Sequence, residues 1–436
     1  MSHSFVISAP HSNSGKTACT LALMKAFKTQ GLKVHGFKCG PDYIDPIFHE
    51  KMVGAKSVNL DGVFQEQGEM QSLFQQYQVP NSVSIVEGVM GLFDGSEGRK
   101  NSTADIAITL DIPVILVVDA SAMAHSVAPL VAGFKNYDPK LKFAGVILNK
   151  VGSEGHYRML KSALDSIEVP CFGWFPDSPL LQIPERHLGL DFSHEIFETS
   201  ETNVENLTEH LDLDLILDTT KSKNTANQAL IHPENEKKEL PICSIAQDEA
   251  FSFLYAQNLN QLRGKYQLVF ISPLRDSAIP TNTQLLYFPG GYPELHLEAL
   301  SNNTEFIKSV QQFAQNGGEV FGECGGFMYM GAAIIGTDGR SYPMLNIFSS
   351  ITNFQHPKMH LGYRELHLKT GVLKGHEFHF SRLQNEPETD LRVKHQNSIH
   401  NSPFYLSNGC IGSFCHFYFG SHSSFPLFLS LWSDRK

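Results

Sequence analysis

Short apolar runs recur along the first 150 residues, and each is followed by a loop and a segment with helical spacing. The runs cover residues 5–8, 34–37, 83–86, 114–118 and 144–148. They are apolar throughout, as in strands of a parallel sheet that is covered on both faces. Leu21, Met24 and Phe27 then share one face of a helix that should begin near Lys16 and end before Gly31. The pattern predicts an α/β domain with a doubly wound sheet.

A second α/β series begins at Pro241, after a segment of different composition. Residues 193–240 are acidic and polar, and we interpret them as a linker with a little helix. The strand-like runs of the second series cover residues 268–271, 285–288 and 319–321. The sequence therefore predicts two doubly wound domains, at residues 1–192 and 241–436, joined by this linker.

The composition is that of an intracellular enzyme. The chain has 436 residues, 42% of them apolar, which is enough for two or three buried cores. A net charge of −11 argues against nucleic acid as the main partner. The seven cysteines show no paired framework and no C-x-x-C spacing, which favours a reducing compartment. Because there is neither a signal-peptide pattern nor a membrane-spanning apolar stretch, we expect a cytoplasmic protein without a membrane partner.

The most informative segment of the second domain is Phe321-Gly-Glu-Cys-Gly-Gly-Phe327. It ends an apolar run and precedes Phe-Met-Tyr-Met, which we interpret as the start of a helix. A sharp turn from strand to helix exposes the residue at the bend, and glycines permit the backbone of such a nucleophile elbow. The helix dipole favours a thiolate there. A buried core cysteine is the alternative, but the surrounding glycines favour Cys324 as a nucleophile.

A cysteine nucleophile needs a base and an oxyanion hole. His416 lies in an aromatic, strand-like segment and is the candidate base, although a histidine among aromatic residues is more often structural. The strand-like run 285–288 leads into a Gly-Gly turn, so backbone N–H groups at Gly291 and Gly325 could bind an oxyanion.

A cysteine, a histidine and a Gly-Gly loop in this arrangement resemble the class I glutamine amidotransferases. These enzymes have a flavodoxin-like fold and release ammonia from glutamine through a thioester. They often carry a glutamate two residues after the histidine, where this chain has Tyr418. The chain is similar in this respect to the cobyric-type subgroup, in which a Cys–His pair suffices.

In the first domain, Ala9-Pro-His-Ser-Asn-Ser-Gly-Lys-Thr17 lies between a predicted strand and a helix. This is the pattern of a phosphate loop, with Pro10 in place of the first glycine. Lys16 would bind the terminal phosphates of ATP. The Par/Min-type switch ATPases carry a second lysine where this chain has His11. The residues expected to bind ATP are Ser12, Asn13, Ser14, Gly15, Lys16, Thr17, Lys38 and Asn149.

Three further segments, at residues 38–46, 87–95 and 149–150, follow predicted strands at the edge where open α/β folds bind ligands. Asn149 could read an adenine edge. Oxygen ligands suit Mg²⁺ beside a triphosphate, and the expected metal ligands are Thr17, Asp45 and Glu87. Each segment alone could be ordinary turn chemistry, but their convergence with the phosphate loop favours a site.

Seven segments in the same order look like the cobyrinic acid a,c-diamide synthase family. They are residues 38–49, 59–61, 87–95, 184–190, 248–253, 322–326 and 375–379. The resemblance implies a dethiobiotin-synthetase-like ATP domain joined to a class I glutaminase domain. It also implies ATP- and glutamine-dependent amidation of the a and c acetate groups of a corrin in cobalamin biosynthesis, with Mg²⁺ and internally transferred ammonia. The expected contacts with the substrate are Asp42, Tyr43, Asp45, Arg186 and His187, although Arg186 could equally form a structural ion pair.

Other functions stay open at this point. The same chemistry could act on hydrogenobyrinic acid or on a nickel sirohydrochlorin, because the sequence does not reveal the metal state of the macrocycle. A nucleotide-dependent binding protein with an inactive glutaminase domain is the alternative of another class. The oligomeric state is not determined by the sequence, and a homodimer stays open.

Overall fold

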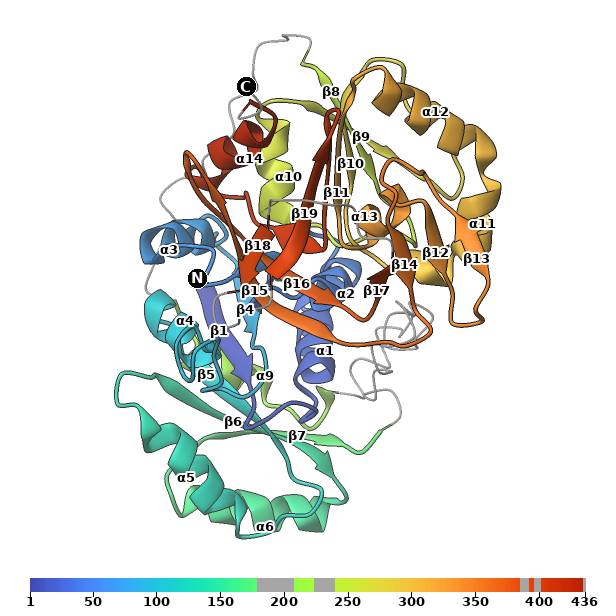
Figure 1. The fold of residues 1–436 in the computed structure, drawn as a ribbon. Helices are drawn as coiled ribbons and strands as arrows, with labels where there is room; N and C mark the ends of the chain where they lie inside the picture. Colours follow the sequence, from blue (N-terminus) through green and yellow to red (C-terminus); the bar gives the residue numbers. More distant parts are fainter. Residues whose placement is uncertain (179–207, 223–239, 385–391, 396–400, 434–436) are drawn as a thin grey trace. The chain divides into compact units, whose positions relative to one another are not determined.

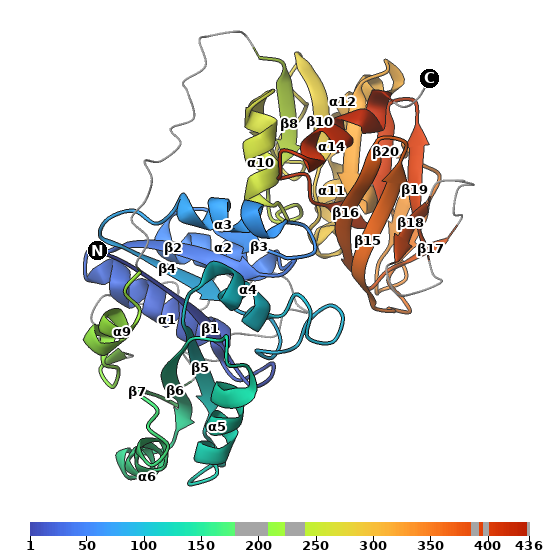
Figure 2. The same cartoon turned by 90° about the vertical axis from the view of Figure 1, so that its left-hand side faces the viewer.

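A computed structural model describes residues 1–178, 208–222, 240–384, 392–395 and 401–433. The chain divides into two compact units, residues 1–233 and 234–436, shown as ribbons in Figure 1 and Figure 2. Among the described residues, no helix is long and apolar enough to cross a membrane.

The first unit contains a seven-stranded parallel sheet with the order β3-β2-β4-β1-β5-β6-β7. Its strands are β1 (Ser2–Ser8), β2 (Lys33–Cys39), β3 (Val58–Leu60), β4 (Ser82–Glu87), β5 (Val114–Asp119), β6 (Phe143–Val151) and β7 (Cys171–Pro176). The apolar runs predicted to be strands lie within β1, β2, β4, β5 and β6. Strands β4, β2 and β3 lie on one side of β1, and strands β5, β6 and β7 lie on the other. The order in which strands are added to the sheet therefore changes direction at β1, and the loop after β1 lies at this switch point.

Helices connect these strands, as a parallel sheet requires. They are α1 (Lys16–Thr29), α2 (Ile44–Val53), α3 (Gln67–Gln75), α4 (Thr103–Leu110), α5 (Val127–Tyr137) and α6 (Glu154–Asp165). Helix α1 covers the predicted range and packs on β1, where the rings of Phe5 and Phe27 meet edge to face with centroids 6.4 Å apart. Figure 2 shows α5 beside β5 and α6 near the edge strand β7.

Residues 208–222 fall in the segment predicted to be a linker, but they pack on the first unit. Leu211 forms a β-bridge with Gly173 of β7, and Lys221 forms one with His3 of β1. Helix α9 (Leu213–Thr219) lies between these two contacts. This part of the predicted linker therefore belongs to the first unit, whereas residues 193–207 and 223–239 lie outside the described residues.

The second unit contains a ten-stranded mixed sheet with the order β21-β16-β15-β18-β19-β20-β11-β10-β8-β9. Strands β9, β8, β10, β11 and β20 are parallel. Beyond β20 the sheet continues, in spatial order, with β19, β18, β15, β16 and β21, and each of these strands pairs antiparallel with its neighbour. A separate four-stranded sheet has the order β13-β12-β14-β17. The predicted doubly wound core is present, and the antiparallel extension is an addition that the short apolar runs did not predict.

The sheet elements and helices of the second unit have the following bounds. The strands are β8 (Ile242–Ala246), β9 (Gln267–Ile271), β10 (Thr283–Phe288), β11 (Glu319–Glu323), β12 (Ala333–Ile335), β13 (Ser341–Pro343), β14 (Ile351–Asn353), β15 (His360–Leu368), β16 (Gly371–His379), β17 (Arg382–Gln384), β18 (Arg392–His395), β19 (Asn401–Ser407), β20 (Cys410–Ser413) and β21 (Cys415–Phe417). The helices are α10 (Ala256–Arg263), η3 (Pro293–Leu295), α11 (Leu297–Asn302), α12 (Thr304–Gln315), α13 (Gly325–Met330) and α14 (Ser424–Ser433). Helix α14 packs on β16 (Figure 2).

Candidate functional sites

The loop after β1 has the backbone of a phosphate loop. Asn13 and Gly15 adopt left-handed angles, with φ of 64° and 91°, so asparagine takes the role that glycine often has in such loops. The Ser14 hydroxyl donates to the carbonyl oxygen of His11 at 2.9 Å, and the Lys16 ammonium donates to the same oxygen at 3.3 Å. The loop therefore curls around the Lys16 side chain at the N-terminus of α1. Ser12 is exposed on this loop.

Glu87, at the end of β4, is the centre of a buried polar network beside this loop. Its Oε1 accepts hydrogen bonds from the Thr17 hydroxyl at 2.6 Å and from the Lys38 ammonium at 3.0 Å. His49 Nε2 lies 2.7 Å from its Oε2. Burial alone would raise the pKa of Glu87, but Lys38, His49 and Thr17 together hold it well below its usual value. The carboxylate is therefore ionised and bound on both oxygens.

The Lys38 ammonium also reaches the loop at the start of α2. It lies 2.5 Å from Oδ2 of Asp45 and 3.9 Å from Oδ2 of Asp42. Asp42 Oδ1 accepts from the backbone N–H groups of Ile44 and Asp45, at 2.9 and 3.2 Å. The structure thus brings together the predicted residues of three strand ends. Tyr43 is buried beside them, and Arg186 and His187 lie outside the described residues.

The oxygen donors near the phosphate loop are suitable for Mg²⁺. The Thr17 hydroxyl and the Glu87 and Asp45 carboxylates are hard oxygen ligands, the kind that Mg²⁺ binds beside a triphosphate. The Lys38 ammonium lies between the two carboxylates and neutralises them. A divalent cation would have to take the place of the Lys38 ammonium between these carboxylates, so the donor types suit Mg²⁺ and the metal stays a prediction.

Asn149, at the end of β6, contacts the phosphate loop directly. Its amide nitrogen donates to the carbonyl oxygen of Ser14 at 3.0 Å. A Cβ atom on Gly15 would lie 2.1 Å from the same nitrogen, which explains why glycine is required at this position. Asn149 therefore supports the loop, and its contact with adenine stays a prediction.

Cys324 occupies a strained turn between β11 and α13. Its φ of 46° and ψ of −109° are unusual for a residue with a side chain, and such strain is typical of functional turns. The backbone N–H of Cys324 donates to Ser413 at 2.8 Å, and its thiol donates to the Phe378 carbonyl at 3.7 Å. The predicted elbow is therefore present.

The pKa of the Cys324 thiol is not lowered, although the helix dipole alone would lower it. Burial, followed by the charge of Glu294, raises the pKa of the Cys324 thiol well above its usual value. The cysteine is therefore a neutral thiol in this state of the protein, and a base must remove its proton during the reaction.

The two predicted oxyanion glycines lie against each other. A Cβ atom on Gly325 would be 3.0 Å from both the nitrogen and the oxygen of Gly291, and 2.8 Å from Cδ of Pro293. A Cβ on Gly291 would be 2.1 Å from the carbonyl oxygen of Ala250. Only glycine fits at Gly291 and at Gly325. The close approach of the two backbone segments therefore explains why both contain a Gly-Gly sequence.

His416, on β21, is fully enclosed next to the same loop. A Cβ atom on Gly290 would lie 2.1 Å from Cε1 of the imidazole ring, so the ring packs directly on the backbone of the oxyanion loop. The Phe253 ring lies on it as well, with centroids 6.3 Å apart. Burial lowers the pKa of His416 to about 3. The imidazole is therefore neutral at physiological pH, and the same burial makes it a weaker proton acceptor than an exposed histidine.

Glu323 connects the nucleophile to the strand of the base, and sequence reasoning missed it. Its Oε1 accepts from the backbone N–H of Phe417 at 2.7 Å, and its Oε2 accepts from the Tyr287 hydroxyl at 2.5 Å. Burial raises the pKa of Glu323 to about 8, although these two hydrogen bonds act in the opposite direction. A glutamate that follows an apolar run and directly precedes the nucleophile was the signal that could have identified it.

A second acidic network lies on β16, the strand that pairs with β21. Glu377 is bound by the Arg364 guanidinium, the Ser402 hydroxyl and Nε2 of His379. The oxygens of Glu377 and the nitrogens of His360 and His379 lie close enough to hold a metal ion. Because Arg364 already provides the positive charge, this network is better explained as support for β16.

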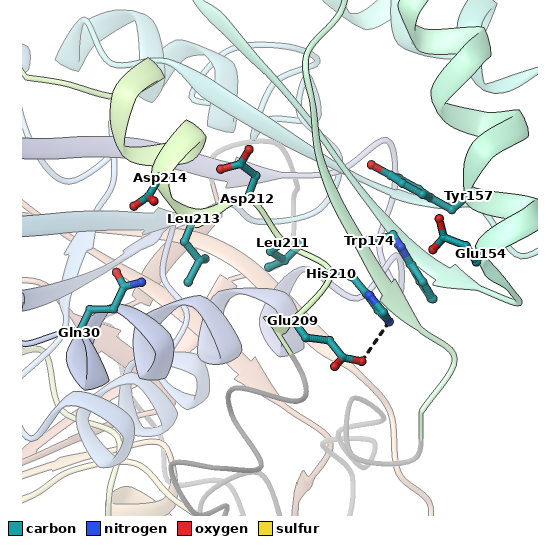
Figure 3. A pocket seen from close by; sticks show the side chains of 10 residues that line it. All are labelled: Gln30, Glu154, Tyr157, Trp174, Glu209, His210, Leu211, Asp212, Leu213 and Asp214. Carbon is teal, nitrogen blue, oxygen red and sulfur yellow. Dashed lines mark ion pairs between the residues drawn. The ribbon is translucent and has the colours of Figure 1, made fainter.

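A cavity of about 560 Å³ lies at the β7 edge of the first unit. Figure 3 shows its side chains, among which the Trp174 and His210 rings stack with centroids 4.0 Å apart. None of the predicted site residues lines it, so the cavity carries no part of the site described above.

Two family models match the two units. Residues 5–190 match the CobQ/CobB/MinD/ParA nucleotide binding domain, and residues 242–424 match the CobB/CobQ-like glutamine amidotransferase domain. Together with the α/β sheets, these matches define a glutamine amidotransferase joined to a nucleotide-binding domain.

Curated relatives match almost the whole chain. The hydrogenobyrinate a,c-diamide synthase of Brucella suis biovar 1 is 37% identical over 429 residues, which cover 94% of this chain and 97% of that protein. The cobyrinate a,c-diamide synthase of a Synechococcus species is 36% identical, with 95% of each chain covered. That of Listeria innocua serovar 6a is 37% identical, with 89% of each chain covered. The chain belongs to this a,c-diamide synthase family of cobalamin biosynthesis and is a glutamine-dependent, amide-forming ligase.

Proposed function

We propose that this protein converts the a and c acetate carboxylates of cobyrinic acid into amides, at the expense of ATP and glutamine. The observation that carries the proposal is that both half-reactions have a candidate site on one chain. The first unit holds Lys16, Lys38 and Glu87 at a phosphate loop, and the second holds Cys324 at a strained elbow.

In the second unit, Cys324 attacks the carboxamide carbon of glutamine while His416 accepts the thiol proton. The oxyanion is bound by backbone N–H groups at Gly291 and Gly325. His416 returns the proton to the leaving nitrogen, ammonia departs, and water hydrolyses the thioester to give glutamate. The neutral thiol and neutral imidazole of the resting state are the correct protonation states for this first step.

In the first unit, a substrate carboxylate attacks the γ-phosphate of ATP and forms an acyl phosphate and ADP. In this mechanism Lys16 and Lys38 neutralise the charge on the phosphates, and Ser12, Asn13, Ser14 and Gly15 supply the loop backbone. Thr17, Asp45 and Glu87 would hold Mg²⁺, which shields the phosphate charge when it is bound. Ammonia then displaces phosphate to leave the amide. Asp42 and Tyr43 lie at the edge where the substrate would bind, and Arg186 and His187 remain predicted contacts.

Labelled substrate tests this mechanism. Purified protein receives MgATP, glutamine and cobyrinic acid whose a and c carboxylates carry ¹⁸O. One labelled oxygen should appear in phosphate for each amide formed, and mass spectrometry should show two acid-to-amide conversions. Unlabelled phosphate would contradict the acyl phosphate. Hydrogenobyrinic acid, offered in parallel, tests the metal state of the macrocycle, because relatives named for both substrates match this chain.

A further inference from the structure

Glu294 is a carboxylate that the glutaminase chemistry described above does not use. It lies in the single-turn helix η3, three residues after Gly291 of the oxyanion loop. Its side chain is partly buried, and its Oε2 atom is enclosed without a hydrogen-bond partner among the described residues. Within the same part of the chain, no ion pair includes Glu294. A buried, unpartnered carboxylate oxygen is unfavourable, which indicates that a ligand completes it.

The position of Glu294 is next to the reacting thiol. Pro293, its neighbour in η3, packs on the backbone of Gly325 at the start of α13, where a Cβ atom would be only 2.8 Å from the proline ring. Of the three carboxylates that raise the pKa of the Cys324 thiol, Glu294 has the largest effect. The group therefore lies within electrostatic reach of the sulfur. Burial raises the pKa of Glu294 itself to about 7, and its ionised form opposes thiolate formation until a cation neutralises it.

Glutamine itself brings such a cation. Its α-ammonium group is separated from the reacting carboxamide carbon by three carbon atoms, a span of about 5 Å in an extended side chain. The site recognises free glutamine only if something binds this end of the molecule. A charge-assisted hydrogen bond to a buried carboxylate is the strongest contact that an ammonium group makes.

We propose that Glu294 binds the α-ammonium group of glutamine and so selects the free amino acid. This inference rests on the proposed role of Cys324 as the nucleophile. Binding of the ammonium group also removes the unfavourable field of Glu294 from the sulfur, so the substrate promotes the deprotonation of the thiol that attacks it. Glu294 is thus a specificity residue that couples substrate binding to activation of the nucleophile.

The test compares glutamine with glutaramate, the same molecule without its α-amino group, on the full-length protein with MgATP and corrinoid present. Hydrolysis of both amides is measured for the unchanged protein, Glu294→Gln and Glu298→Gln. Glu298 is the matched control, because it is an exposed glutamate on the adjoining helix α11. We expect Glu294→Gln to lower kcat/KM for glutamine about 100-fold and not to lower that for glutaramate, because the substitution also removes the charge that opposes thiolate formation. Glu298→Gln should change neither.

A binding measurement separates this inference from the proposal on which it rests. In a Cys324→Ala background, Glu294→Gln should weaken glutamine binding by calorimetry while leaving circular dichroism unchanged. Equal losses for glutamine and glutaramate, or no loss for either, would overturn the role of Glu294. Glutamine hydrolysis that persists in Cys324→Ala would instead refute the nucleophile, and it would leave the binding comparison intact.

Discussion

The carboxylate of Glu323 accepts a hydrogen bond from the backbone N–H of Phe417 at 2.7 Å. Glu323 immediately precedes the candidate nucleophile, and Phe417 immediately follows the candidate base. This one contact therefore connects the end of β11 to β21, two strands that are not neighbours in the sheet. The contact holds the strand that carries His416 in place through the residue next to Cys324. The class I glutamine amidotransferases often carry an orienting glutamate two residues after the histidine, where this chain has Tyr418.

Removal of the Glu323 carboxylate should lower the stability of the protein and its use of glutamine, but not amide formation from ammonium. Glu323→Ala leaves the Phe417 N–H and the Tyr287 hydroxyl without their acceptor, which should lower the free energy of unfolding by about 3 kcal/mol. It should lower glutamine-dependent turnover about 100-fold through misplacement of the base. Glu323→Gln, which retains an acceptor, should lose less than about tenfold. Equal losses with glutamine and with ammonium would contradict this role.

The backbone of Gly290 should not tolerate a side chain. In Gly290→Ala the new methyl group would lie 2.1 Å from the His416 ring, so the imidazole must move. We expect glutamine hydrolysis to fall at least about 100-fold. Gly133→Ala on α5, where a Cβ atom meets nothing within 4 Å, is the control for the substitution itself. Steady-state glutamate release measures both, and an active Gly290→Ala protein would refute the placement of His416.

The stability of the protein should depend on pH through Glu323. In the unfolded chain this group ionises above about pH 4.3, whereas burial raises its pKa in the folded protein to about 8. Its stabilising contribution is therefore complete below pH 4.3 and is lost as the pH rises to 8, by as much as about 5 kcal/mol. Calorimetry from pH 5 to 8.5 should show that Glu323→Gln gains stability relative to the unchanged protein as the pH rises. A constant difference between the two would contradict the raised pKa.

Lys16 should be needed whichever nitrogen source is supplied. Lys16→Ala removes the side-chain ammonium group that the phosphate loop surrounds. We expect ATP-dependent amide formation to fall about 1,000-fold, whether glutamine or free ammonium supplies the nitrogen. Lys33→Ala, at an exposed lysine that begins β2, should retain activity. Amide formation coupled to ADP release measures both variants. Retention of activity in Lys16→Ala would contradict the assigned loop.

The parallel core could be predicted from the sequence because its strands are short, fully apolar runs. The same rule misses β15 and β16, because these strands mix buried with partly exposed positions and carry His360, Arg364 and Glu377. The carboxylate of Glu377 is bound in part by a residue farther along the sequence, Ser402. Periodicity in a single segment does not reveal such pairs.

The candidate sites divide in the same way. Local motifs with their own backbone geometry, the phosphate loop and the elbow at Cys324, could be predicted and are present. Contacts between segments that are distant in the sequence could not be predicted. Asn149 supports the phosphate loop, Glu323 binds the backbone of β21, and Glu294 lies within electrostatic reach of the Cys324 thiol. The dipole argument for a thiolate was incomplete, because burial outweighs the helix terminus at this site.

The central claim is that sulfur chemistry liberates the nitrogen and phosphate chemistry fixes it. Amide formation by Cys324→Ser, measured by mass spectrometry with MgATP and corrinoid, tests it with glutamine and then with ammonium as the donor. The account predicts that glutamine no longer supports the reaction and that ammonium supports it at nearly the unchanged rate. Loss of the reaction with both donors, or its survival with glutamine, would contradict the account.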